Sequence, residues 1–114
     1  MKYMLLIYEA EIAGSEPPPD ELQQWFAVTD EMQKAGVMVA GDALQPTPTA
    51  TTVRAPNGRT VTSDGPFAET KEQLGGYYII DVPDLDEAVR WAGKMPNVGR
   101  GSIEVRPVME FDQT

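Results

Sequence analysis

Two short segments, residues 3–8 and 77–82, constrain the fold more than any other part of this sequence. They are apolar at nearly every position, with only Asp81 breaking the run. A strand with one face in water alternates apolar and polar residues, so these segments indicate strands that are buried on both faces. If helices covered only one face of the sheet, the other face would be a large exposed apolar patch. The simplest cover is a second copy of the same sheet, related by a two-fold axis, which predicts a homodimer.

The remaining segments predict two helices, a hairpin and two more strands. A first helix is expected to start at an Asp20 N-cap, after three prolines, and to end at Gly36. A second helix is expected after Pro83, with Asp84 as its N-cap. Its buried stripe is expected to be Leu85, Ala88, Val89 and Ala92, and that of the first helix Leu22, Trp25, Phe26, Thr29, Met32 and Gln33.

The other expected elements are a strand at 37–40, a hairpin of 51–55 and 59–63, a helical turn within 69–74, and a last strand at 103–111. The hairpin is indicated by the turn sequence Pro56-Asn57-Gly58. The order is β-α-β, hairpin, β-α-β. Without the hairpin, this order is the split βαβ pattern. The sequence therefore predicts one ferredoxin-like α+β domain, residues 1–114, with an inserted hairpin and both helices on one face of an antiparallel sheet.

Composition excludes several functions. The chain has no cysteine and no histidine, so disulfides, thiolate chemistry and catalytic pairs that need histidine are absent from it. Nine basic and eighteen acidic residues give a net charge of −9, which argues against direct nucleic-acid binding. No segment is long and apolar enough for a membrane span, and residues 1–10 lack a signal-peptide cleavage pattern. A cytoplasmic protein without membrane association is the expectation.

The densest group of reactive residue types lies within residues 64–76. Asp64 and Glu69 are candidate proton-transfer groups, and Lys71 is a candidate for neutralising an anionic ligand. Its three glycines would let backbone approach a ligand, although they match no phosphate-binding spacing. The alternative is a structural loop, with Phe67 anchored in the core and acid–lysine pairs at the surface.

Three further positions are candidates for the site. Asp42 follows Gly41 at a strand end, where it is either a turn residue or a catalytic carboxylate. Glu104 and Arg106 are two apart in a strand, so they share a face and form either an ion pair or part of a polar pocket. The acids near residue 84 lack the spacing of a calcium loop and are interpreted as helix capping, so no metal or cofactor is expected.

The stretch Asp64-Gly65-Pro66-Phe67-Ala68-Glu69-Thr70-Lys71-Glu72 resembles the motif of the DGPF group in the YCII-related family. The opening MKYMLLIYE, the segments 50–54 and 74–78, and the segment 101–107 fit the same pattern. The resemblance implies a ferredoxin-like subunit paired into a dimeric α/β barrel. It also implies that relatives place a histidine in the first helix, near Gln24 or Trp25, with an acidic partner near Asp42, and another histidine near Arg100.

Two functions from different classes follow. The first is a small-molecule enzyme or degenerate enzyme with a pocket between the sheet and the loop 64–72. In it, Asp64 or Glu69 would move protons, Lys71, Arg54 or Arg106 would hold an anionic group, and Phe67 would help to bury the carboxylates. The second, implied by the resemblance, is a ligand-sensing module associated with a sigma factor, without turnover. A structural dimer without any pocket is the third alternative.

Overall fold

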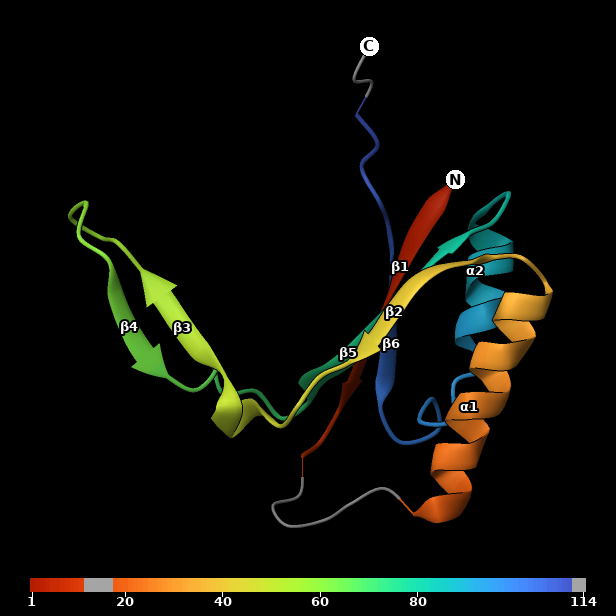
Figure 1. Cartoon of the computed structure of the whole chain (residues 1–114), viewed down its shortest axis with the longest axis horizontal. Coiled ribbons are helices and arrows are strands. Elements are labelled where there is room, and N and C mark those ends of the chain that lie inside the picture. The colour runs from red at the N-terminus through yellow and green to blue at the C-terminus, as the bar shows by residue number, and fades with distance from the viewer. Residues whose placement is uncertain (12–17, 112–114) are drawn as a thin grey trace.

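The computed structural model describes residues 1–11 and 18–111, and it contains two helices, six strands and a short 3-10 helix. Figure 1 shows their arrangement. The elements are β1 (Lys2–Glu9), α1 (Pro19–Lys34), β2 (Met38–Ala43), η1 (Thr47–Thr49), β3 (Thr51–Arg54), β4 (Val61–Asp64), β5 (Gln73–Asp81), α2 (Leu85–Ala92) and β6 (Ser102–Pro107).

Four strands form an antiparallel sheet in the order β2-β5-β1-β6. The two strands expected to be buried on both faces, β1 and β5, are the central pair, with Leu5 opposite Tyr78. β6 lies at an edge, where Pro107 removes no hydrogen bond from a further strand. This α+β arrangement is compatible with the expected ferredoxin-like fold.

Both helices cover the same face of this sheet. Alternate residues of β1 and β5, including Leu5 and Ile80, are fully buried against α1 and α2. The helices contribute Val28, Met32, Ala88, Trp91 and Ala92 to this core. The opposite face, which we call the open face, carries Met4, Leu6, Tyr77 and Ile79, all of which remain partly accessible in a single chain. The prediction that both helices lie on one face is confirmed.

Local details of the helices differ from the sequence prediction. α1 begins at Pro19, and its N-cap is Pro18, two residues before the expected cap Asp20; Pro18 makes no side-chain hydrogen bond. The fixed φ of proline suits the first helical turn and needs no capping side chain. In α2 the expected cap is confirmed, because the Asp84 carboxylate accepts a hydrogen bond from the Glu87 backbone N–H at 3.0 Å.

The buried stripes were only partly predicted. On α1, Leu22, Phe26 and Gln33 are exposed, whereas Val28 is buried together with Met32. On α2, Leu85 and Val89 are exposed and Trp91 is buried instead. The apolar spacing on each helix is compatible with more than one buried face. The way in which the helix packs across the sheet decides which of these faces is buried. Residues 69–74 form no helical turn, since β5 already begins at Gln73.

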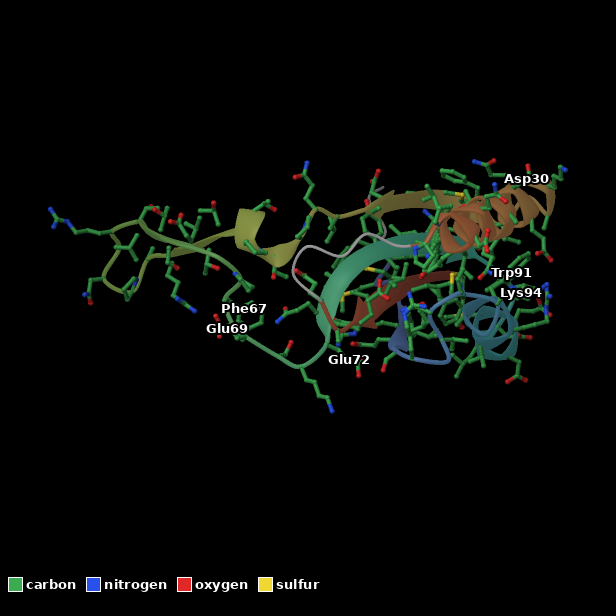
Figure 2. All side chains as sticks on the ribbon, turned by 90° about the horizontal axis from the view of Figure 1, so that it is seen from below. Asp30, Phe67, Glu69, Glu72, Trp91 and Lys94 are labelled. Carbon is green, nitrogen blue, oxygen red and sulfur yellow. The ribbon has the colours of Figure 1, made fainter. Side chains whose placement is uncertain are left out.

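The hairpin β3–β4 stands away from the rest of the molecule, and we call residues 51–64 the arm. Figures 1 and 2 show it projecting from the body in two perpendicular views. Its strands pair from Thr51–Asp64 to Arg54–Val61, and Gly58 supplies the positive φ of the turn. The arm makes the radius of gyration 16.2 Å, against about 13 Å for a compact chain of this length.

Candidate functional site

A cleft of about 950 Å³ lies where α1, β2 and β5 meet, and it is the larger of two hollows described here. Its size is in the range that accommodates a small organic ligand, and its lining is mainly apolar. Residues from both faces of the sheet line the cleft, because β2 is an edge strand and ends beside the cleft. Its lining includes Trp25, Thr29, Asp42, Tyr77, Tyr78 and Arg100.

On the helix side, the cleft is shaped by a contact between α1 and β5. The hydroxyl groups of Thr29 and Tyr78 lie 2.7 Å apart within hydrogen-bond distance. The ring of Tyr78 passes so close to Gly41 that a Cβ there would lie 2.6 Å from the ring. Glycine at position 41 therefore lets the tyrosine ring lie flat against β2 and reach the helix.

On the open face, the cleft contains a carboxylate and a phenol in direct contact. The Tyr77 hydroxyl donates a hydrogen bond to Asp42 Oδ2 at 2.9 Å, as expected for side chains of paired residues on one face. This hydrogen bond, and the negative charge of Asp42, raise the pKa of Tyr77 above its ordinary value. Tyr77 therefore keeps its proton at neutral pH, and the second Asp42 oxygen remains an acceptor.

Removing this carboxylate is expected to lower the pH at which Tyr77 ionises. In Asp42→Ala the phenolate is no longer opposed by a hydrogen-bonded negative charge, so its pKa moves back toward 10.0. Below that value the contact stabilises the folded state, and this contribution is lost as pH rises through the raised pKa. Ultraviolet titration of phenolate absorbance measures the shift, and Tyr77→Phe identifies the signal among the four tyrosines. Identical curves for wild type and Asp42→Ala would show that the contact does not form in solution.

One side of the cleft is held by an arginine between two acids. Arg100 pairs with Glu9 at 2.8 Å and also with Glu21 of α1. These hydrogen bonds, that with Glu21 foremost, raise the pKa of the guanidinium, which remains charged. The three side chains join the end of β1, the first turns of α1 and the loop before β6. Because residues distant in sequence meet here, the pairing fixes the width of the cleft at this side.

Residues 64–72, which we call the DGPF loop, border a separate and smaller hollow of about 400 Å³. Glu69 and Lys71 line it together with Glu11 and Thr47, so two of the predicted site residues lie near each other. Asp64 lies at the exposed end of β4 and is outside this lining. Phe67 is 79% exposed, which contradicts the interpretation that it anchors the loop in the core. Figure 2 shows Phe67 and Glu69 between the arm and the body, away from Trp91.

The other predicted ligand-binding residues lie elsewhere. The Arg54 guanidinium donates to the Phe67 carbonyl at 3.4 Å, at the base of the arm. Glu104 and Arg106 form an ion pair of 2.6 Å on β6, opposite Leu6 and Met4 of β1. The expectation of an ion pair is thus confirmed, and the pair is partly exposed on the open face. Of the candidates, only Asp42 lies in the large cleft.

Sequence reasoning from residue types alone missed most of this cleft. Only the family resemblance connects Trp25 and Arg100 with a site, because it places histidines near them, and both line the cleft with Asp42. Tyr77 was interpreted as an apolar strand residue, since the hydrogen bond to Asp42 depends on the register of β2 against β5. Leu22 and Phe26, which α1 leaves exposed at the cleft, give no sequence signal, because they fit the same apolar spacing as buried residues.

Within residues 1–11 and 18–111, no group of three or more acidic side chains is arranged to hold a metal ion. Neither of the described helices has the length and apolar character needed to cross a membrane.

Comparison with known proteins adds a family and one relative. The model of the YCII-related domain matches residues 1–112. An uncharacterized protein of Rhizobium meliloti (strain 1021) is 40% identical over 114 residues, which cover 95% of this chain and 92% of that protein. The match therefore extends over the cleft, the arm and the DGPF loop alike.

Proposed function

Since this chain belongs to the YCII-related family, we propose that it binds a small organic molecule in the cleft between α1, β2 and β5. The observation that carries the proposal is the Asp42–Tyr77 contact, placed in a mostly apolar hollow of about 950 Å³. Such a hollow gives affinity through its apolar walls and orientation through the polar pair. The DGPF loop is assigned a supporting role, because its own hollow is smaller and contains only exposed charges.

The chemistry of the pair defines the type of ligand group. Asp42 presents a carboxylate oxygen that accepts a hydrogen bond, while Tyr77 is occupied as its donor partner. A ligand hydroxyl or N–H group therefore fits Asp42, with the apolar part of the ligand against the neighbouring apolar lining of the cleft. If the ligand is turned over, Asp42 is the residue placed to accept its proton, which makes acid–base chemistry the reaction class.

Matched aromatic probes test this assignment. Phenol donates a hydrogen bond, and anisole has nearly the same shape without a donor. We expect wild-type protein to bind phenol about fivefold more tightly than anisole, which corresponds to about 1 kcal/mol for one net hydrogen bond. In Asp42→Ala the ratio is expected to fall close to one. The measurement is an NMR titration that follows the indole N–H of Trp25, which lines the cleft.

The control variant is Asp64→Ala, which removes a carboxylate of the DGPF motif outside the cleft. It should keep the preference for phenol. Loss of the preference in Asp64→Ala but not in Asp42→Ala would move the binding site to the DGPF loop and refute the assignment.

We also propose that the functional unit is a homodimer in which the open faces of two sheets pack together as a dimeric α/β barrel. The support is the side-chain pattern of the open face, where Met4, Leu6 and Ile79 lie next to one another on the paired central strands β1 and β5. Water covers this apolar surface in a single chain, and burying it in a second copy is favourable.

A further inference from the structure

We propose that the arm of one copy lies across the cleft of a second copy and brings its arginines to the acidic rim there. This inference deepens the proposed function, because it rests on the homodimer and makes the binding site a product of two chains.

Within the described residues, the arm receives little support from the rest of its own chain. β3 and β4 pack on each other, and they make no extensive contact with any other described helix or strand. Hydrogen bonds from Gly65 N–H to the Ala50 carbonyl (2.7 Å) and from the Thr52 hydroxyl to the Gly65 carbonyl (2.8 Å) keep its base ordered. A two-stranded hairpin is marginally stable by itself in water. A folded arm in this position is therefore expected to gain stability from another surface.

Charge identifies the kind of surface. The arm, residues 51–64, contains Arg54, Arg59 and one acid, Asp64 at its base, so it carries +1 while the rest of the chain carries −10. The cleft is lined by four acids, Glu9, Glu11, Glu21 and Asp42, and by one base, Arg100. Within the described part of the chain, neither Glu11 nor Asp42 forms an ion pair. A cationic arm and an acidic cleft are complementary partners.

The exposed apolar side chains of the arm and of the cleft support the same contact as the charges do. Val53 and Val61 of the arm are 60% and 50% exposed. At the cleft, α1 exposes Leu22 and Phe26, and the chain after β2 exposes Leu44. Packing these two groups together removes apolar surface from water on both copies.

The chain whose cleft receives the arm is assigned as a second copy for two reasons. The acidic partner that the arm requires is present on this chain itself, so no other protein is needed. The homodimer would also bring together two chains of −9 each, and pairing arm arginines with rim carboxylates reduces that repulsion. Nucleic acid is disfavoured because two arginines lie beside a strongly acidic body.

Cross-linking tests the arrangement directly, because the chain has no native cysteine. One variant carries Asn57→Cys in the arm turn, and an isotopically heavy variant carries Gln45→Cys at the cleft. The two are mixed and treated with a short bismaleimide. Mass spectrometry is expected to show at least tenfold more heavy–light product than in a control mixture with Asp86→Cys on α2, which is outside the cleft lining.

A charge reversal provides a second measurement. Arg59→Glu is expected to raise the dimer dissociation constant about tenfold, while Lys34→Glu, with the same charge change on α1, is expected to alter it less than threefold. Lys34 pairs only with Asp30 of its own helix among the described residues.

The outcomes separate this inference from the proposals on which it rests. A dimer that gives equal or no cross-linking at the two positions overturns the assignment of the arm and leaves the homodimer standing. If the wild-type protein is a monomer, both the homodimer and the proposed contact of the arm are wrong. The ligand site is then still tested by the phenol titration. Cross-linking at residue 45 that persists when the open face carries Leu6→Asp supports the arm and rejects the sheet interface.

Discussion

The substitution Leu6→Asp is expected to convert the protein from a dimer into a folded monomer at micromolar concentration. Leu6 lies at the middle of the open face, opposite Tyr77 on β5 and Glu104 on β6. In the proposed dimer, an aspartate here would be an unpaired charge in an apolar interface, which costs several kcal/mol. We therefore expect the dissociation constant to rise at least 100-fold, as measured by sedimentation velocity.

The matched control is Leu85→Asp at the start of α2. Leu85 is 51% exposed, and an acid suits the first turn of a helix, so dimerisation and fold should be unchanged. Far-ultraviolet circular dichroism of Leu6→Asp should match that of wild type, since the aspartate reaches water in a monomer. If Leu6→Asp sediments as a dimer with an unchanged dissociation constant, the open face is not the interface.

The second large effect is expected in the core. Leu5→Ala should lower the free energy of unfolding by about 3 kcal/mol, because it removes buried methyl groups and leaves a cavity. Leu5 is fully buried on the central strand β1, between Tyr78 of β5 and Val105 of β6. Neighbours on both sides are held by the sheet, so the site collapses little after truncation.

Urea denaturation at one fixed protein concentration measures this change, since dimerisation makes apparent stability depend on concentration. Leu85→Ala is the control, because the same atoms are removed from a side chain that is 51% exposed and lies outside the cleft lining. Its expected effect is below about 0.5 kcal/mol. Equal losses for both variants would contradict the assignment of the core to one face of the sheet.

The elements could be predicted from local sequence because their signals are local. Residues 3–8 in β1 and 77–80 in β5 are apolar without interruption, Gly36 ends α1, and Pro56-Asn57-Gly58 marks the turn of the arm. The face that each helix buries was harder to predict. Leu22 and Phe26 satisfy helical spacing as well as Trp25 and Val28 do, and only the docking of α1 on the sheet distinguishes them.

Less of the candidate site than of the fold could be predicted from the sequence. Asp64, Glu69 and Lys71 drew attention because reactive residue types are dense in that stretch, yet the large cleft contains none of them. Asp42 was identified from its position at a strand end, and its partner Tyr77 lies 35 residues away. Nothing local links these two residues, because their contact follows from strand pairing.

By itself, the sequence determined the class of fold, the two-sided character of β1 and β5, and the absence of histidine and cysteine chemistry. These properties depend on the period of apolar residues and on composition, which need no knowledge of distant contacts. The tertiary structure decided that Asp42, Tyr77, Trp25 and Arg100 share one cleft and that the arm stands apart from the body. Both depend on strand order and register, which bring together residues far apart in the chain.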